Sequence, residues 1–286
     1  MLAALFYGPY EPFRLLWINT ALYSSRFKFL ATALYSEEYI RSVLDKNKPA
    51  QDRKTDAGAV DISGGEGIYF DPVKGDYFRG FLIKIEDPRR VELVCSGDPR
   101  GMLLESMTAG HRALGGINAS GYADEKQRGA PWGHTIVDGS LVSRSLRDGR
   151  HVMGGFTGDY KMVVGLFTDD EIAALQYRWA FEFGPLLIVN GEKTELTDFS
   201  GGLAPRSAIG QLKNGAVLLA VVDGRRPGSL GATFKDMQTI LYANGAVNAI
   251  GLDGGSSATM VYRGKVVNTP SEGEAQRLLP NAIIFK

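Results

Sequence analysis

Two stretches, Val217-Leu218-Leu219-Ala220-Val221-Val222-Asp223-Gly224 and Val247-Asn248-Ala249-Ile250-Gly251-Leu252-Asp253-Gly254-Gly255, decide the fold. Each is an apolar run that stops at Asp-Gly, which is the pattern of a buried strand entering a polar loop. Between them, residues 233–244 have apolar positions at helical spacing, a Thr cap with an acid three residues later, and a glycine stop. The pattern predicts a strand-helix-strand unit over 217–253.

Such a unit places its strands parallel in one sheet, so that both carboxyl ends open on the same edge, where ligands bind. We therefore expect Asp253 and Asp223 to converge as a catalytic pair. Gly254 and Gly255 would let backbone N–H groups approach an oxyanion, with Ser256 beside them. The alternative is that each Asp-Gly is only a turn. That alternative is weaker for Asp253, which Gly-Gly-Ser-Ser and a returning strand follow.

Basic residues occur in the same half of the chain. Arg206 lies in Ala204-Pro205-Arg206-Ser207-Ala208, and Arg225 and Arg226 follow the first aspartate. Arginine presents a planar fork of donors that suits phosphate. Arginines beside two carboxylates indicate an anionic substrate whose other end undergoes acid or base chemistry.

Two further candidates lie outside these stretches. Glu182 stands between two phenylalanines and is either a third site carboxylate with a raised pKa or an exposed strand residue. His134 lies in a Gly-rich loop that could line the site. His111 and His151 have no motif around them, so the sequence predicts no metal constellation. No cofactor is demanded, although acids and loop carbonyls are compatible with a hard cation such as calcium.

The overall pattern predicts an α+β fold with a mixed, twisted β-sheet core, flanking helices and an N-terminal helical arm. We assign 1–50 to the arm, with a helix capped by Ser36, 51–79 to a polar linker, and 80–286 to the catalytic domain. Further helices are predicted over 102–113 and 169–175.

The composition limits the classes of partner that the protein can have. The chain has 286 residues, of which 44% are hydrophobic and 22% charged, and its 32 basic residues balance 32 acidic ones. These values are typical of a globular domain and give no field that would attract nucleic acid. The stub Met1–Tyr7 is too short to span a membrane. We expect an extracellular or cell-surface protein with an anchor upstream of this sequence, or else a cytoplasmic one; a lone Cys95 fits either.

Five ordered motifs carry a family resemblance. They are Gly116–Tyr122, Ala204–Gly210, Val222–Arg225 with Ser229–Gly231, Leu252–Ser257, and Val267-Asn268 through Pro280-Asn281-Ala282. Together they resemble the phosphodiester glycosidase (NAGPA-type) family from about residue 80 to the C-terminus. The arm, with Leu16–Ala21, resembles that of a Gram-positive subgroup labelled exopolysaccharide biosynthesis proteins.

The resemblance implies a hydrolase that cleaves the glycosidic bond of a sugar-1-phosphodiester in a cell-surface or extracellular glycan. The products would be a sugar and a phosphate monoester, as for the family's lysosomal member, which removes N-acetylglucosamine. The first motif departs from the family's commonest form, since Ala119-Ser120-Gly121-Tyr122 stands where Gly-Gly-Tyr-Phe is usual. That change bears on the identity of the substrate.

The implied roles are specific. A departing phosphate monoester has a second pKa of about 6 and needs little protonation. Asp253 would act at the anomeric carbon as nucleophile or base, with Asp223 as its partner, while Arg206 and Arg225 stabilise the phosphate. Asn118 and Asn281 would bind sugar hydroxyls or orient the acids. The alternatives are a metal-assisted phosphodiesterase that cuts the P–O bond and a non-catalytic polysaccharide-binding or assembly module.

Overall fold

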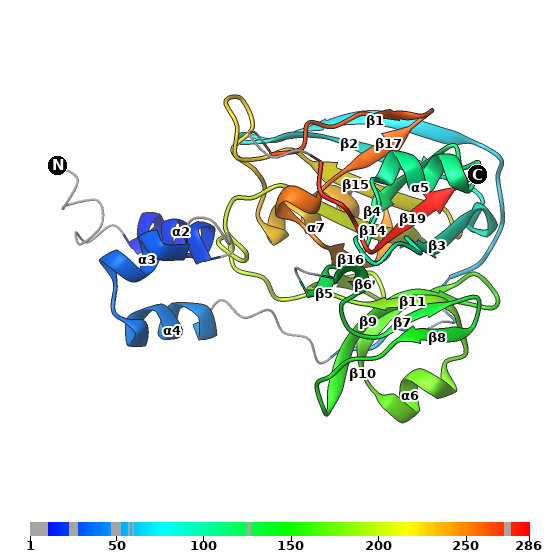
Figure 1. Ribbon diagram of the computed structural model, residues 1–286, viewed down its shortest axis with the longest axis horizontal. Coiled ribbons are helices and arrows are strands. Elements are labelled where there is room, and N and C mark those ends of the chain that lie inside the picture. Colours follow the sequence, from blue (N-terminus) through cyan, green and yellow to red (C-terminus); the bar gives the residue numbers. More distant parts are fainter. Residues whose placement is uncertain are drawn as a thin grey trace.

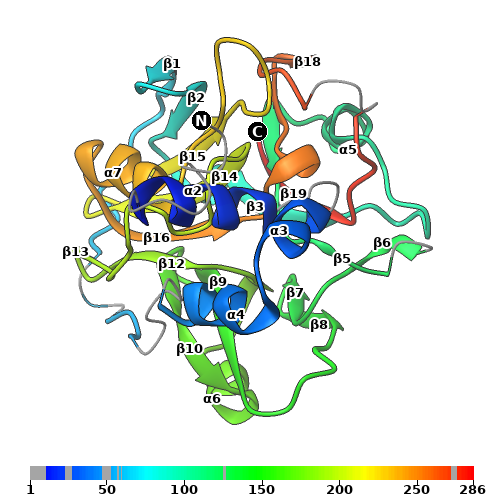
Figure 2. The same cartoon turned by 90° about the vertical axis from the view of Figure 1, so that its left-hand side faces the viewer.

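The computed structural model describes residues 11–22, 28–46, 53–56, 58, 60–124, 127–271 and 276–286. A helical arm lies to one side of a β-rich body, in which several sheets pack together (Figures 1 and 2). The stub at Met1–Tyr7 and parts of the expected linker lie outside the described residues. Among those that are described, no helix has both the length and the apolar character needed to cross a bilayer.

The arm consists of α2 (Glu11–Leu22), α3 (Lys28–Leu34) and α4 (Glu37–Lys46). Ser36 starts α4 as predicted, because its hydroxyl accepts the Tyr39 N–H at 3.3 Å. Ala21, Ala31 and Ile40 form a small core of their own. The arm contacts the body through the Leu203 N–H, which donates to Thr20 Oγ1 at 3.0 Å.

Three antiparallel sheets form the body. Their strands, in spatial order, are β1 (Ile68–Lys74), β2 (Arg79–Ile85), β15 (Val217–Val222), β14 (Arg206–Leu212), β16 (Ala246–Leu252), β12 (Leu186–Val189) and β13 (Glu192–Lys193) in the first; β10 (Met162–Thr168), β9 (Arg150–Thr157), β11 (Tyr177–Glu182), β7 (Thr135–Val137) and β8 (Ser140–Ser143) in the second; and β18 (Lys265–Val266), β17 (Met260–Tyr262), β4 (Gly115–Asn118), β19 (Asn281–Phe285) and β3 (Val91–Cys95) in the third.

The remaining elements complete the expected α+β fold. They are the hairpin of β5 (Tyr122–Asp124) and β6 (Gln127–Pro131), the helices α5 (Leu104–Gly110), α6 (Asp169–Ala174) and α7 (Phe234–Ala243), and two short 3₁₀ turns, η2 (Pro88–Arg90) and η3 (Gly255–Ser257). The helices expected over 102–113, 169–175 and 233–244 are thus present as α5, α6 and α7, and each lies against a sheet (Figure 1).

The continuous apolar run of β15 has a packing cause. Leu219 and Val221 face the central core between the sheets, whereas Leu218, Ala220 and Val222 face a second core beneath α7. Because side chains alternate along a strand, a strand that is covered on both faces must be apolar at every position. All six residues of β15 are accordingly buried.

The strand-helix-strand unit is present in altered form. Thr233 and Asp236 form the predicted capping box of α7, and β15 and β16 run parallel in one sheet. However, β14 lies between them and is antiparallel to both. Adjacent strands are about 4.8 Å apart, so the two strand ends lie roughly 10 Å apart along the sheet edge. Arg206, the first residue of β14, therefore lies between Asp223 and Asp253 at that edge.

The assignment of residues 51–79 to a linker is corrected, because residues 68–74 form β1, which pairs along its whole length with β2. Upstream of it, the Thr55 N–H donates to the Val164 carbonyl at 2.9 Å on β10. Residues of the expected linker are therefore part of the body. Turn-rich composition concealed this edge strand, whose Asp71 and Pro72 are rare inside sheets.

Candidate active site

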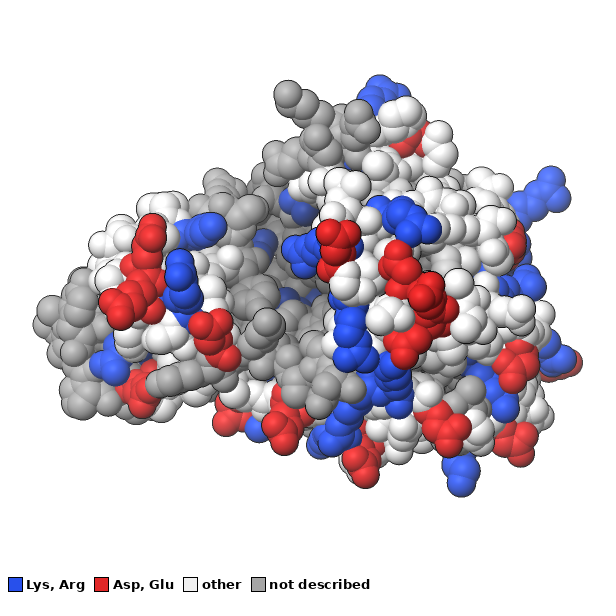
Figure 3. Space-filling view, turned by 90° about the horizontal axis from the view of Figure 1, so that it is seen from below, with Lys and Arg blue, Asp and Glu red and all other residues white. Residues whose placement is uncertain are grey.

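A cavity of about 350 Å³ opens beyond the carboxyl end of β16 and beside the start of β14. Its lining combines one carboxylate, three arginines, aromatic rings and a Gly-Gly-Ser turn. The residues are Tyr122, Phe183, Gly184, Ala204, Arg206, Arg225, Phe234, Leu252, Asp253, Gly254, Gly255, Ser256 and Arg277. On the face of the molecule seen from below, Lys and Arg side chains gather beside a hollow (Figure 3).

Asp253 is placed by the end of β16. Its N–H donates to the Ala119 carbonyl at 2.8 Å, and its own carbonyl accepts the Asn118 side-chain amide at 2.6 Å. Burial raises the pKa of the Asp253 carboxyl; a hydrogen bond from Ser257, the charge of Arg277, the Gly254 N–H and Arg206 oppose this rise only in part. A carboxylate with poor hydration and adjacent cations is a typical reactive group.

Arg206 reaches the cavity because the sheet register pairs its neighbour Ser207 with Leu252. The buried guanidinium donates through Nε to the Ala232 carbonyl at 3.1 Å and through Nη2 to the Gly201 and Gly202 carbonyls. Its Cζ lies 4.1 Å from the centroid of the Phe234 ring. These contacts hold the planar group in one orientation before any ligand arrives.

Two further arginines complete the basic wall. Arg225 has a φ of 57°, an uncommon conformation for a residue with a Cβ. A Cβ on Gly255 would lie 3.4 Å from the Arg225 guanidinium, which shows how closely the turn approaches it. Arg277 donates to Ser257 Oγ at 3.4 Å, and its charge opposes the rise that burial causes in the pKa of Asp253. Sequence reasoning missed Arg277, since no motif surrounds it.

The glycine turn has a different role from the one expected. The Gly255 N–H donates to the Pro205 carbonyl at 2.9 Å, and the Gly254 N–H donates to the Asp253 carboxylate. Both N–H groups already have partners within the protein, so they do not form an open phosphate cradle. A Cβ on Gly254 would lie only 2.8 Å from the Pro205 carbonyl oxygen, so the glycine serves close packing. Ser256 remains in the lining of the cavity.

Asn118 and Asn281 are fully buried outside the lining. Besides holding the Asp253 carbonyl, Asn118 accepts the Ser207 hydroxyl at 2.7 Å. Asn281 Oδ1 accepts the Ser120 N–H at 3.0 Å. Because both amides are buried, they do not contact sugar hydroxyls. The alternative prediction was that they orient the acid. Asn118 does so directly, by holding the Asp253 carbonyl, and Asn281 acts indirectly, by holding the turn that follows β4.

Asp223 does not enter the cavity of Asp253. It lines a separate cavity with Arg226, and its Oδ1 accepts the Thr269 N–H at 2.8 Å and the Asn268 amide at 3.2 Å. Burial raises its pKa, and these hydrogen bonds and the Arg226 charge oppose the rise. The expected convergence is wrong because β14 separates the two strands. Asp223 instead secures the segment that follows β18.

Asp223→Ala is expected to lower stability more than activity. The change leaves the buried Asn268 amide and the Thr269 N–H without this acceptor, which costs about 1–3 kcal/mol. Hydrolysis per folded molecule should fall by less than about tenfold, because Asp223 faces another cavity. Urea unfolding and steady-state kinetics measure the two effects. An activity loss as large as that expected for Asp253→Asn would instead support the predicted catalytic pair.

Glu182 and His134 also lie outside the Asp253 cavity. Glu182 ends β11 and is buried, not exposed; its Oε2 accepts the His134 backbone N–H at 2.9 Å and lies 3.2 Å from His134 Nδ1. Burial alone would raise the pKa of Glu182, but the His134 N–H and the imidazoles of His151 and His134 hold it below its usual value. The prediction of a raised pKa for Glu182 is therefore wrong.

The pH dependence of stability should reveal the state of Asp253. Its pKa is raised in the folded protein, so the ionised group costs stability above the unfolded value of about 3.9. Asp253→Asn should consequently unfold at a higher temperature than the parent at neutral pH, with a difference that shrinks as the pH falls toward that value. Thermal unfolding across pH tests this, with the exposed Asp148→Asn as control. A pH-independent difference would contradict it.

The fold and the cavity together define a class of protein: an α+β protein in which a cavity brings one carboxylate together with arginines that suit an anionic substrate. The model of the phosphodiester glycosidase (NAGPA) family matches residues 111–286. The chain therefore belongs to the phosphodiester glycosidase family.

Several known proteins are similar. The SPbeta prophage-derived uncharacterized protein YomE of Bacillus subtilis (strain 168) is 30% identical over 185 residues, which are 59% of this chain and 27% of YomE. Mouse N-acetylglucosamine-1-phosphodiester alpha-N-acetylglucosaminidase is 25% identical over 228 residues, covering 70% of this chain and 43% of the mouse protein. The chain thus spans less than half the length of these curated relatives.

A solved structure shares the fold. It is the zebrafish N-acetylglucosamine-1-phosphodiester alpha-N-acetylglucosaminidase catalytic domain, auto-inhibited by its pro-peptide. The superposition has a TM-score of 0.66 at 20% identity and covers 82% of this chain and 88% of the zebrafish chain. A putative exported protein from Burkholderia pseudomallei matches with a TM-score of 0.56 at 15% identity, over 73% of this chain and 74% of that one.

Proposed function

We propose that this protein hydrolyses the glycosidic bond of a sugar-1-phosphodiester and releases a sugar and a phosphate monoester. One observation carries the proposal: among the residues that the structure describes, Asp253 is the only carboxylate that lines a cavity holding three arginines. Ordinary glycosidases need a second carboxyl group to protonate the leaving oxygen. A phosphate monoester leaves without one, so a site with a single acid suits this substrate.

Different lining residues act on the phosphate and on the sugar of the substrate. Arg206, Arg225 and Arg277 bind the phosphate and stabilise the charge that grows on it as the C–O bond breaks. Tyr122 and Phe183, which lie in the lining with Asp253, provide apolar faces for the sugar ring. Asp253 attacks the anomeric carbon, or takes a proton from the water that does. The water oxygen ends on the sugar, and the bridging oxygen leaves on the phosphate.

Solvent oxygen labelling tests this assignment. The protein is incubated with a panel of sugar-1-phosphodiesters in ¹⁸O water, and mass spectrometry locates the label. Label in the sugar supports the proposal, whereas label in the phosphate would mean P–O cleavage by a phosphodiesterase. Tight binding without turnover across the panel would favour a polysaccharide-binding module instead. The anomeric configuration of the product, read by NMR, then separates a nucleophilic Asp253 (retention) from a basic one (inversion).

The proposed natural substrate is a cell-surface or extracellular glycan. This part of the proposal rests on the resemblance of the arm to the exopolysaccharide-labelled Gram-positive subgroup. Treating purified wall polymers and exopolysaccharides with the protein should release sugar only from polymers that contain glycosyl-phosphodiester links. Equal release from polymers without phosphate would argue against it.

A further inference from the structure

A cluster of titratable groups lies outside the Asp253 cavity, in the second sheet. His134 precedes β7, His151 is in β9, Asp169 begins α6 and Glu182 ends β11. The two histidines and Glu182 are buried, whereas the Asp169 side chain is 49% exposed. Four segments that are distant in sequence therefore converge on one point, and the cavity site uses none of these side chains.

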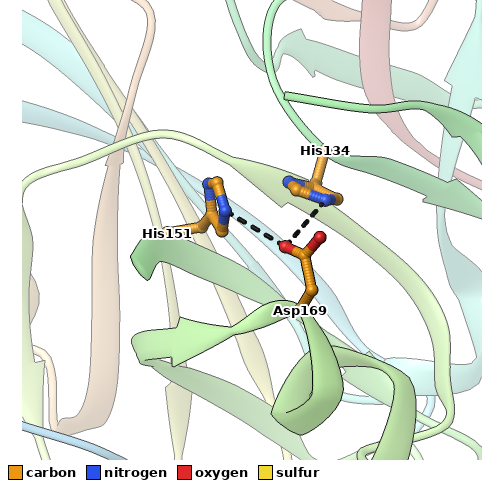
Figure 4. A group of neighbouring side chains, drawn as sticks. All are labelled: His134, His151 and Asp169. Atoms are coloured by element: carbon orange, nitrogen blue, oxygen red, sulfur yellow. Dashed lines mark ion pairs between the residues drawn. The ribbon is translucent and has the colours of Figure 1, made fainter. Parts of the chain in front are cut away.

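The geometry within the cluster is that of a ligand set. His134 Nε2 and His151 Nε2 lie 3.5 Å and 3.2 Å from the same oxygen of Asp169, and the two rings are 4.4 Å apart between centroids (Figure 4). All three ligand atoms lie within 4.8 Å of one another. Ligand atoms at about 2.0–2.1 Å from a tetrahedral zinc ion are roughly 3.3 Å apart, so the spacing fits such an ion.

Glu182 orients both rings from the opposite side. Its two oxygens lie 3.2 Å from His134 Nδ1 and 3.2 Å from His151 Nδ1, although the angle at His151 departs from that of a hydrogen bond. A carboxylate only accepts, so it favours rings that carry their proton on Nδ1. The Nε2 lone pairs then point at the Asp169 oxygen. Three electron-pair donors face one another there, and a cation at their centre would balance them.

We infer that His134, His151 and Asp169 form a site for a divalent transition-metal ion of the zinc type, with Glu182 as the carboxylate that positions the imidazoles. Imidazole ligands favour zinc, copper, iron or nickel ions over calcium and magnesium, which prefer oxygen ligands. Arg144 Nη1 lies 2.8 Å from Asp169 Oδ2 and holds the carboxylate so that Oδ1 faces the imidazoles.

Three protein ligands leave one coordination position open. A cavity of about 300 Å³, lined by His134, Asp169 and Arg144 among others, adjoins the cluster and provides room for water there. The bound ion would join β7, β9 and α6. Through Glu182 it would also steady the next residues, Phe183 and Gly184, which line the Asp253 cavity.

Zinc binding to the untagged, chelator-treated full chain tests the site. Isothermal titration with zinc alone is expected to show a single site, and thermal unfolding should shift upward with added zinc. Cobalt substitution should give the visible absorption of a tetrahedral complex. His151→Ala and Asp169→Asn should each weaken zinc binding by more than about a hundredfold, and Glu182→Gln by about 10–100-fold. These readouts are independent of catalysis.

The control variant is His111→Ala, which removes an exposed histidine elsewhere and should leave zinc affinity unchanged. Asp169→Asn keeps the shape of a half-exposed side chain and should therefore leave the fold intact. Circular dichroism monitors folding in every variant. The inference is overturned if the parent does not bind zinc at micromolar concentrations. It is equally overturned if the folded His151→Ala and Asp169→Asn variants bind zinc as tightly as the parent, which would mean an adventitious site.

Discussion

Asp253→Asn is expected to lower kcat/KM for a sugar-1-phosphodiester by at least about a thousandfold. Asparagine has nearly the same shape as aspartate, but its amide neither attacks the anomeric carbon nor accepts a proton from water. The other described lining residues offer no second carboxylate that could take over. Steady-state kinetics with a defined phosphodiester measures the loss.

The matched control for this change is Asp148→Asn, since Asp148 is exposed and lies outside the cavity. The control should retain the activity of the parent. If Asp253→Asn hydrolyses the phosphodiester as fast as the parent does, the assignment of Asp253 and with it the proposed mechanism is wrong.

Arg206→Lys is expected to lower kcat/KM by about a hundredfold or more, although the positive charge is kept. The guanidinium is fixed by three backbone carbonyls and by the Phe234 ring, and an ammonium group reproduces neither the planar fork nor the stacking. Affinity for inorganic phosphate, measured as competitive inhibition, should fall in parallel. A loss of stability without a loss of phosphate affinity would instead assign Arg206 a structural role.

The exposed Arg263→Lys serves as the matched control, because Arg263 also lies against an aromatic ring, that of Tyr262, but outside the cavity. It should leave both kcat/KM and phosphate inhibition unchanged. Comparing the two variants separates the effect of exchanging arginine for lysine from the effect of its place in the site.

Local pattern was enough to predict much of the fold. The apolar runs of β15 and β16 and the capping box of α7 are determined within a few neighbouring residues, so the sequence predicted them. The position of Asp253 at a strand end followed from the same reasoning. Arg206 was predicted as a site residue from its chemistry, and the β14 register explains how it reaches Asp253.

The errors share a physical cause, which is pairing between distant segments. No local pattern shows that β14 inserts between two parallel strands, yet that insertion is what keeps Asp223 away from Asp253. His151 lacked any motif, and His134 was expected to line the main site, because their contacts with Asp169 depend on the order of strands in the second sheet. Arg277 approaches Asp253 from the far end of the chain, after the last helix and outside any periodic element.

Pro205 bears on how the specificity of this site could evolve. A Cβ on Gly224 would approach the Pro205 nitrogen to 2.5 Å, and a Cβ on Gly254 would approach the Pro205 carbonyl oxygen to 2.8 Å. One proline thus fixes both strand-end turns against backbone atoms that cannot move aside. New substrate preferences are therefore accessible mainly through Tyr122 and Phe183, lining residues whose side chains can be exchanged while the backbone stays in place.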